Sequence, residues 1–216
     1  MWTLDAIIKK DIFSKVTVGL IPSRMGSQRL PGKALALIEE IPVVVHVAKR
    51  AQFAKQLESV IVCTDSIEII NVCNEYEIQT VKTGEHFRNG TERIASVAKE
   101  LNDELFIDIQ GDEPLVDPEH IDKVAIYLSE NKDKCDIVIP TLEVPYSSPD
   151  TIVRVQTSNT NRVMTLSRSM IPHRYRETTP VIRKHLSIIG FTKKGLNQYL
   201  SYEESPNEVV EGIELL

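Results

Sequence analysis

Short apolar runs alternate with amphipathic segments over the first two thirds of the chain. Near-continuous apolar runs predict strands at 16–22, 59–64, 78–83 and 104–110, and helical periodicity predicts helices at 42–56, 65–76, 90–101 and 118–130. Asp65 stands where it could cap the second of these helices. This alternation is typical of right-handed βαβ units, and strands so uniformly apolar indicate a parallel sheet with helices on both faces.

The pattern changes after Cys135. Strands joined by turns are predicted at 135–144, 151–157, 162–168 and 184–192, with a hairpin around 158–161, and helix returns only from Lys193. The chain is therefore predicted to be α/β, with a mostly parallel core and a smaller mixed-strand insertion. We divide it into an N-terminal extension, a nucleotide-binding core, a strand-rich lobe and a C-terminal helical segment, at 1–15, 16–134, 135–192 and 193–216.

Composition and charge narrow the class of protein. A net charge of −6 and an isoelectric point of about 5.5 argue against a general binder of nucleic acids or acidic membranes. No apolar run approaches the ~20 residues of a membrane helix, and charges interrupt the N-terminal patches, which excludes a secretory signal. Cys63, Cys73 and Cys135 form no close ligand pairs, so we expect reduced thiols and a cytoplasmic protein.

The loop SRMGSQRLPGK at 23–33 is basic within an acidic protein. It lacks the G-x-G-x-x-G of a dinucleotide-binding loop. It also fails as a P-loop, because five residues separate Gly26 from Gly32 and Ala34 follows Lys33 where a hydroxyl is needed. Two alternatives remain. Either the loop is solvated, or its cations converge on an anion such as a triphosphate, the residues being Arg24, Arg29 and Lys33.

A second loop, IQGDEPLV at 109–116, follows another predicted strand. Asp112 and Glu113 are held there at a tight turn, and magnesium binds through one or two carboxylates together with substrate phosphate. The alternative is a turn aspartate, or a capping network around Asp117. Ligands of open parallel sheets bind beyond the carboxyl ends of the strands, so the two loops together predict a nucleotide–metal site.

These residues match a known family. RMGSQRLPGK resembles the R-x-x-S-x-R-L-P-G-K signature of the CMP-KDO synthetases (3-deoxy-manno-octulosonate cytidylyltransferases). The resemblance continues through VCTD, NGTERIASV, IQGDEPLV, LSRSMIP, KHLSIIGF and SPNEVVEGIELL. It implies a Rossmann-like nucleotidyltransferase core and the reaction of CTP with KDO (3-deoxy-manno-octulosonate) to give CMP-KDO and pyrophosphate. The product of such enzymes enters lipopolysaccharide or capsule synthesis.

The resemblance also implies roles for single residues. The triphosphate would be bound by Arg24, Ser27, Arg29 and Lys33, and Asp112 would hold Mg²⁺; Arg24, Lys33 and Asp112 are the catalytic candidates. Gly90, Thr91 and Arg93, at a predicted helix N-terminus, would face the nucleotide. Gln110 would lie near the ribose or the sugar.

Sugar-binding positions follow from the same resemblance. Arg168 would pair with the sugar carboxylate, and His185, Glu208 and Glu211 complete the set with Gln110. A histidine on an apolar strand is by itself more typical of a satisfied core residue. For His185 the family match favours the sugar site instead.

The chain departs from the family at three places. Ile189 to Thr192 replace a usual Tyr-Gly-Tyr-Arg, and Asp108 stands where asparagine is more common, which we interpret as a polar strand end rather than a helper carboxylate. The sequence also ends before a G-x-D-T-P-E-D-like motif that carries a second magnesium-binding aspartate. Either the chain is truncated or the enzyme itself is incomplete, and we expect it to bind CTP with weak or no catalysis.

The remaining expectations concern partners and alternatives. The ligands would be CTP and a 3-deoxy-ulosonate sugar, and the resemblance implies a homodimer, for which we nominate the lobe at 135–192 as the contact. Three functions stay open: the KDO enzyme, a cytidylyltransferase for amino-KDO or another ulosonate variant, and a catalytically impaired nucleotide-binding paralogue.

Overall fold

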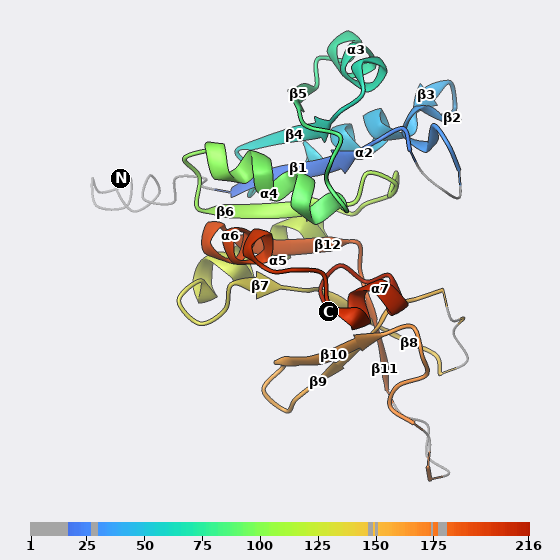
Figure 1. Ribbon diagram of the computed structural model, residues 1–216, viewed down its shortest axis with the longest axis vertical. Coiled ribbons are helices and arrows are strands. Elements are labelled where there is room, and N and C mark those ends of the chain that lie inside the picture. The colour runs from blue at the N-terminus through green and yellow to red at the C-terminus, as the bar shows by residue number, and fades with distance from the viewer. Residues whose placement is uncertain (1–16, 27–29, 147–148, 150, 174, 177–180) are drawn as a thin grey trace, which may run out of the picture.

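A computed structural model describes residues 17–26, 30–146, 149, 151–173, 175–176 and 181–216. Figure 1 shows an α/β core above a smaller sheet, with the C-terminal segment between them. The expected N-terminal extension, Ser27 and Arg29 lie outside the described residues. None of the described helices is long and apolar enough to cross a bilayer.

The central sheet confirms the predicted mostly parallel core. Its strand order over the described residues is β5-β4-β1-β6-β12-β7. β5, β4, β1 and β6 run parallel, and β12 is antiparallel to β6 and to β7. The strands are β1 Thr17–Ser23, β4 Ser59–Thr64, β5 Gln79–Lys82, β6 Leu105–Ile109, β7 Ile137–Val138 and β12 Ile188–Thr192.

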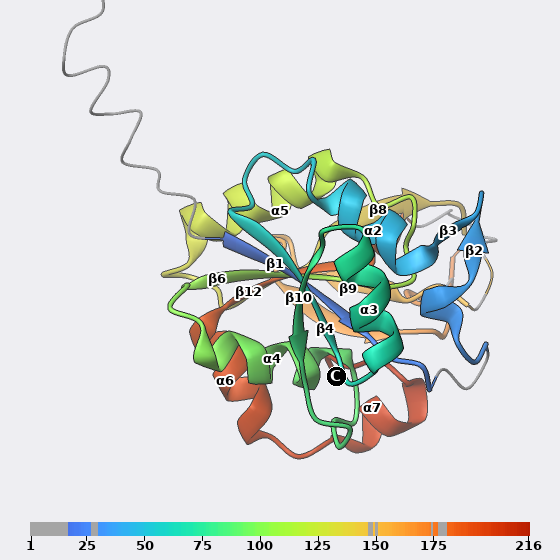
Figure 2. The same cartoon turned by 90° about the horizontal axis from the view of Figure 1, so that it is seen from above.

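Helices cover both faces of this sheet, as Figure 2 shows from above. One face carries α2 (Val43–Ala51), α3 (Ile67–Glu75) and α5 (Pro118–Asn131), and the other carries α4 (Gly90–Glu100) and α6 (Lys193–Ser201). The first layer is almost purely aliphatic, whereas the second contains Phe106 and Phe191. Each fully buried large apolar side chain contributes roughly 1.5–3 kcal/mol, so these two layers hold the core together.

The smaller sheet is antiparallel, in the order β10-β9-β11-β8. Its strands are β8 Thr141–Val144, β9 Arg154–Thr157, β10 Val163–Ser167 and β11 Ile182–His185. The predicted hairpin joins β9 to β10, and Asn161 takes the left-handed conformation in its turn (φ 60°). The remaining elements are η1 (Lys33–Leu35), β2 (Leu37–Ile38), β3 (Ile41–Pro42) and α7 (Pro206–Glu211).

The single strand expected at 184–192 is two strands in different sheets. Residues 188–192 are all buried and join the central sheet as β12, whereas in 182–185 only Ile182 is buried and the segment forms β11. β7 also belongs to the central sheet, so the range 135–192 is divided between the two sheets. Gly190 makes this packing possible, because a Cβ there would lie 2.9 Å from Val124 Cγ1 on α5.

The prediction that Asp65 caps the second helix was wrong by one position. Ser66, not Asp65, is the N-cap of α3, and its Oγ accepts a hydrogen bond from the Ile69 N–H at 3.2 Å. The Asp65 carboxylate instead receives a hydrogen bond from Arg93, at 2.9 Å. A buried guanidinium requires a charged partner more strongly than a helix end requires one particular cap.

Candidate active site at the carboxyl edge of the sheet

Two loops leave the carboxyl ends of the neighbouring strands β1 and β6 in close contact. A Cβ at Gly111 would lie 2.6 Å from the Pro22 carbonyl oxygen, so only glycine allows the loop after β6 to approach β1 this closely. The Lys33 ammonium contacts the Asp112 carboxylate across this junction. The two side chains are 35% and 43% exposed, so they stand at the open edge.

The conformation of the first loop explains where Lys33 lies. Gly32 adopts a left-handed conformation (φ 70°) and donates its N–H to the Met25 carbonyl at 3.0 Å, which turns the chain back on itself before η1. Arg24 follows the last residue of β1, and its side chain is exposed to solvent. Ser27 and Arg29 lie outside the described residues, so the expected convergence of Arg24, Arg29 and Lys33 stays a prediction. Of the two described cations, Lys33 is the one that contacts Asp112.

The second loop holds its two carboxylates differently. Glu113 accepts a hydrogen bond from the Ser187 hydroxyl at 2.7 Å, and the Gln110 N–H binds the Ser187 carbonyl at 3.2 Å. Arg50 donates to the Val116 carbonyl at 2.9 Å and supports the far end of the loop. Glu113 therefore anchors the loop to the turn before β12, while Asp112 faces Lys33.

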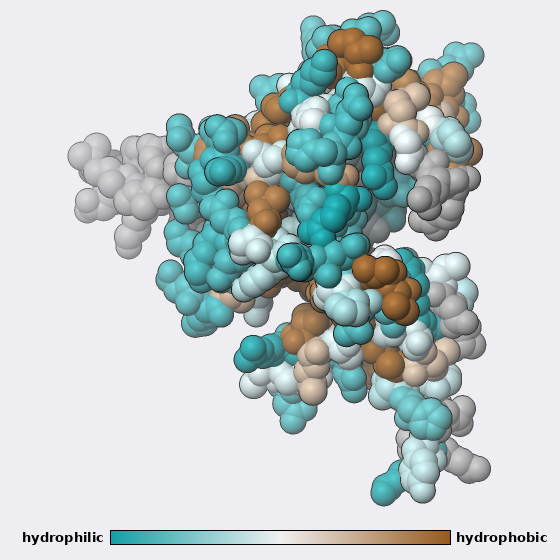
Figure 3. All heavy atoms as spheres, viewed as in Figure 1, coloured by the Kyte–Doolittle hydropathy of each residue, from teal (hydrophilic) through white to brown (hydrophobic). Residues whose placement is uncertain are grey.

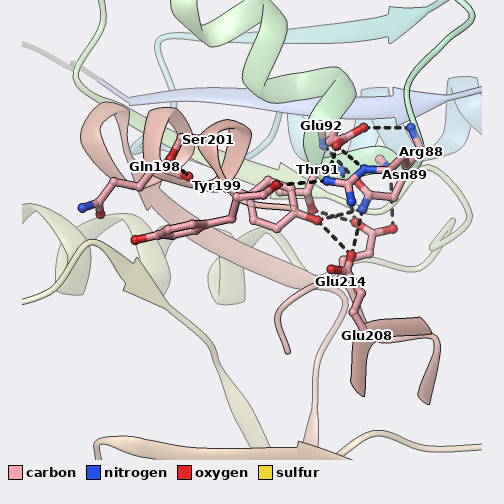
Figure 4. Close-up of polar contacts among 11 residues, drawn as sticks. Arg88, Asn89, Thr91, Glu92, Gln198, Tyr199, Ser201, Glu208 and Glu214 are labelled. Atoms are coloured by element: carbon pink, nitrogen blue, oxygen red, sulfur yellow. Dashed lines mark hydrogen bonds and ion pairs between the residues drawn. The ribbon is translucent and has the colours of Figure 1, made fainter. Parts of the chain in front are cut away.

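The N-terminus of α4 forms a third side of this edge. A Cβ at Gly90 would lie 3.0 Å from Pro22 Cγ, so the helix begins directly against the end of β1. Glu214 from the C-terminal segment accepts hydrogen bonds from the Gly90 N–H at 3.4 Å and the Thr91 N–H at 3.1 Å. The Thr91 hydroxyl lies 2.7 Å from the same carboxylate (Figure 4). The peptide groups expected to face a nucleotide thus bind an anionic side chain here.

Arg93 lies in the interior rather than at the open edge. It is 2% exposed, and besides Asp65 it donates to the Gly84 carbonyl at 3.1 Å and to the Thr83 hydroxyl. Its guanidinium carbon lies 5.7 Å from the centre of the Phe87 ring. These contacts hold the loop between β5 and α4, so Arg93 shapes the approach to the helix N-terminus.

Asp108 is a fully buried carboxyl group on β6. Burial raises its pKa well above the usual value, the Glu214 carboxylate raises it further, and the Thr91 hydroxyl acts in the opposite direction. Thr91 Oγ1 and Gln110 Nε2 both lie 3.5 Å from Oδ2, and Oδ1 has no hydrogen-bond partner among the described residues. The neutral acid form has nearly the shape of asparagine, the residue that the family more often has there.

His185 ends β11 close to the turn that holds Glu113. Burial, and to a smaller extent the neighbouring Lys184 ammonium, lower the pKa of its imidazole to about 4. Nε2 is buried without a hydrogen-bond partner in the described part of the chain. A neutral ring with an unused polar atom suits a ligand hydroxyl better than a ligand carboxylate.

The other expected sugar-binding residues are held by protein groups. Arg168 donates to the backbone carbonyls of Glu211 at 2.8 Å, Thr151 at 3.0 Å and Gly212 at 3.2 Å. The Glu211 carboxylate accepts from the Ser167 hydroxyl at 2.6 Å and from the Arg168 N–H at 2.9 Å. Together they fasten α7 to the small sheet. Glu208 is buried against α4 and α6.

The positions where the chain departs from the family lie in the core. Ile189 and Phe191 pack in the layer beneath α4 and α6, at 4% and 0% exposure. The Thr192 hydroxyl caps α6 by accepting from the Gly195 N–H at 3.0 Å, and it also donates to Asp136 at 2.8 Å. None of these three side chains is exposed at the open edge.

The carboxylate proposed to bind Mg²⁺ at this edge is that of Asp112. Among the described residues there is no cluster of three or more His, Cys, Asp or Glu side chains that could hold a metal ion. Mg²⁺ nevertheless needs only one or two protein carboxylates when substrate phosphates and water complete its octahedron. The exposed Asp112 carboxylate beside Lys33 fits that requirement.

Sequence reasoning missed Asn89, Tyr199 and Glu214. Asn89 caps α4 by accepting from the Glu92 N–H at 2.9 Å, and the spacing Asn-Gly-Thr-Glu is a recognisable capping signal. Tyr199 and Glu214 come from segments more than a hundred residues away along the chain. No local pattern connects them to α4.

Comparisons with known proteins identify the family of this chain. Residues 18–216 match the family model described as cytidylyltransferase. A 3-deoxy-manno-octulosonate cytidylyltransferase of Chlorobium phaeobacteroides (strain BS1) is 36% identical over 91% of this chain and 82% of its own length, and that of Polynucleobacter asymbioticus is 38% identical over 91% and 80%.

A solved structure of CMP:2-keto-3-deoxy-manno-octonic acid synthetase complexed with CTP superposes with a TM-score of 0.86. It is 26% identical and is matched over 92% of this chain and 83% of that one. Both the sequence and the fold therefore place the chain in one family. The chain belongs to the cytidylyltransferase family, within the group of the 3-deoxy-manno-octulosonate cytidylyltransferases.

Proposed function

We propose that this protein transfers CMP from CTP to KDO, releasing pyrophosphate. The anomeric hydroxyl of the sugar acid attacks the α-phosphorus in line, a new P–O bond forms, and the bond to the β-phosphate oxygen breaks. The hydroxyl proton leaves to solvent or base. Catalysis of this kind is mostly positioning and charge neutralisation, which the loops at the sheet edge can supply.

The observation that carries the proposal is the contact between Lys33 and Asp112. It brings a cation from the loop after β1 and a carboxylate from the loop after β6 to one point at the carboxyl edge of the sheet. The curated relatives carry the name of this activity. Lys33 would neutralise the charge on the triphosphate, with Arg24, Ser27 and Arg29 as further phosphate ligands.

Asp112 would hold Mg²⁺, the proposed cofactor. When bound, the ion neutralises charge on the phosphates and polarises the α-phosphoryl group. Lys33 and the N-terminus of α4 at Gly90 and Thr91 would orient the nucleotide around it. Lys33 would exchange its contact with Asp112 for the triphosphate, because both the metal and the ammonium seek the same anionic groups.

The sugar would lie between the core and the small sheet, where Figure 3 shows an open notch. Gln110 and His185 would bind its hydroxyl groups. Arg168, Glu208 and Glu211 would act on the sugar site chiefly by holding α7 and the small sheet in place. The names of the curated relatives support KDO over an amino-KDO or other ulosonate variant. Ile189 and Phe191, where the chain departs from the family, are buried rather than exposed at the edge.

The test measures pyrophosphate release from CTP and magnesium, with KDO and a panel of related sugar acids. Asp112→Asn and Lys33→Met are expected to lower kcat/KM by roughly 10²–10³-fold, because each removes charge stabilisation from the transition state. Lys132→Met is the matched control, since Lys132 is an exposed cation at the end of α5.

Release with KDO supports the proposal, and release only with another sugar supports a different ulosonate. CTP binding without release from any sugar supports the impaired paralogue. Equal activity of Asp112→Asn and the unaltered protein at limiting magnesium would remove the basis of the proposed metal site.

We also propose a homodimer formed through the small sheet. Leu142, Val163 and Met164 leave apolar surface exposed on β8 and β10 (52%, 39% and 66%). Sedimentation of the unaltered protein and of Met164→Glu tests this, and a monomer in both cases contradicts it. A cytoplasmic location is consistent with Cys63, Cys73 and Cys135 being free thiols.

A further inference from the structure

The capping residue of α4 is held by side chains from two other helices. Asn89 Oδ1 accepts from the Glu92 N–H at 2.9 Å. Its amide nitrogen donates to the Tyr199 hydroxyl oxygen at 2.7 Å and to Glu208 Oε1 at 3.2 Å. Figure 4 shows the three side chains meeting at the start of α4, Tyr199 from α6 and Glu208 from α7.

These contacts fix which way the Asn89 amide faces. The Tyr199 hydroxyl donates to Glu208 Oε1 at 3.2 Å and therefore offers only a lone pair to Asn89. Turning the amide over would set its oxygen against the Glu208 carboxylate and its NH₂ against the Glu92 N–H. Burial raises the pKa of Tyr199, so the hydroxyl keeps its proton and its role as donor to Glu208.

Two hydrogen bonds hold the Tyr199 hydroxyl. The side chain borders a pocket of about 220 Å³, whose wall also includes Glu208, Glu214 and Arg88. Glu208 itself is 7% exposed, and its N–H donates to the Ser205 hydroxyl at 3.0 Å, which fixes the start of α7. Without the bond to Asn89 the ring has room to shift.

The start of α4 has little freedom to absorb such a shift. Gly90 follows Asn89 directly and lies against Pro22, where a Cβ would come within 3.0 Å of Cγ. A small change at Asn89 therefore changes the direction of the Gly90 and Thr91 N–H groups. Those groups already bind a carboxylate, Glu214, so their aim determines what the helix end can bind.

We propose that Tyr199, acting with Glu208, is a positioning residue for the nucleotide: it orients the Asn89 cap and thereby the N-terminal peptide groups of α4. This rests on the proposed function, because it assumes that CTP binds at this helix end. Tyr199 touches no reacting atom in the scheme. Its effect passes through Asn89.

The first experiment compares Tyr199→Phe with the unaltered protein, by calorimetric CTP binding and by steady-state pyrophosphate release. We expect CTP affinity to fall, and KM for CTP to rise, about fivefold to tenfold, with kcat within about twofold, since the loss affects ground-state and transition-state binding alike. Tyr202→Phe is the control, because its side chain is 67% exposed on the same segment.

The second experiment replaces the Asn89 amide with a capping group that does not have to be oriented by Tyr199. In an Asn89→Ser background the cap is a hydroxyl that requires no partner to choose its direction, so Tyr199→Phe should change CTP affinity there by less than about twofold. Glu208→Gln in the Asn89 protein provides a second variant of the network, with an expected loss of affinity of a few fold.

Unchanged CTP affinity in Tyr199→Phe, or an equal loss in both backgrounds, overturns the positioning role. A fall in melting temperature without a change in affinity does so as well. Failure of the proposed function looks different: the unaltered protein would release no pyrophosphate with any sugar, while the calorimetric comparison could still be made. Absence of CTP binding by the unaltered protein overturns both proposals.

Discussion

At the scale of single residues, the polar side chains at the carboxyl edge of the sheet are of two kinds. Some stabilise the fold through contacts with other protein groups, and others remain exposed and could bind a ligand. Arg93 was expected to face the nucleotide, and Glu113 stands beside Asp112 in the same loop. Glu113 accepts a hydrogen bond from Ser187, however, and Arg93 is buried against Asp65. Asp112 and Lys33 remain partly exposed and contact each other, which makes them the proposed reactive pair.

Buried groups at this edge are kept neutral by their surroundings. Asp108 lies beside a second carboxylate with no cation among its described hydrogen-bond partners, so its acid form is favoured. The His185 ring is neutral for the complementary reason, because burial penalises the imidazolium.

The lowered pKa of His185 predicts a pH-dependent stability. The unfolded chain takes up a proton on this ring as pH falls below about 6.5, whereas the folded protein does so only near 4. The contribution of the neutral His185 ring to the free energy of unfolding is therefore fully present above pH 6.5. It is lost as pH falls towards 4, by up to about 3 kcal/mol. We expect His185→Gln to flatten the slope of unfolding free energy over this window in urea titrations.

The exposed His173→Gln serves as the control for that measurement, since its ring is in solvent. Parallel slopes for His185→Gln and the unaltered protein between pH 4 and 6.5 would show that the ring titrates normally when folded.

At the scale of elements, α4 is the helix whose ends and faces meet most of the site. Its apolar face packs on the sheet through Ile94, Ala95 and Ala98, while its N-terminus is fixed by Asn89. Arg93 ties its first turn to the loop after β5. A helix held at both the cap and the first turn is a rigid platform for binding through backbone N–H groups.

The pair between Arg93 and Asp65 predicts a large effect on folding. Asp65→Ala leaves a guanidinium that is 2% exposed without its charged partner, so we expect a loss of about 3 kcal/mol or more in unfolding free energy. Chemical denaturation measures it. The matched control is Glu85→Ala, an exposed acidic residue in the loop that Arg93 supports.

A loss below about 1 kcal/mol, similar to that of a surface ion pair, would contradict this reading of the pair as buried and structural.

At the scale of the whole molecule, Arg168 joins the small sheet to the C-terminal segment. It donates to the Glu211 and Gly212 carbonyls at the end of α7 and to the Thr151 carbonyl before β9, and the Glu211 carboxylate accepts two hydrogen bonds from the end of β10 and the residue after it. The notch seen in Figure 3 lies between this assembly and the core. Its shape therefore depends on contacts far from Asp112.

Arg168→Lys is expected to loosen this assembly. Lysine has a single ammonium and cannot match the fork that reaches carbonyls in two segments, so we expect about 1–2 kcal/mol of local stability to be lost. Hydrogen exchange of residues 205–216 should accelerate by roughly tenfold, because a tenfold change in opening corresponds to ~1.4 kcal/mol.

Arg183→Lys is the control, because Arg183 forms only a long contact, 3.8 Å, with the exposed Glu143 and a 3.3 Å bond to Thr157. If KM for the sugar rises strongly in Arg168→Lys while exchange is unchanged, the arginine acts on the sugar directly.

The sequence alone determined the elements and the two loops. Near-continuous apolar runs placed β1, β4 and β6, and helical periodicity placed α4, nearly where they lie, because strands buried on both faces and a helix buried on one face impose these patterns on any chain. The β1 and β6 loops were located because ligand sites in such sheets follow strand ends. Lys33 and Asp112 were both named on that basis.

Only the tertiary structure decided which polar groups face the ligand edge and which are held inside. Three features depend on contacts between segments distant in sequence. These are the division of 184–192 between two sheets, the pairing of Asp65 with Arg93, and the contact of Tyr199 with the Asn89 cap of α4. Hydrogen bonds and ion pairs between such segments carry no local periodicity. Their partners become fixed only when burial leaves each polar group one partner within reach.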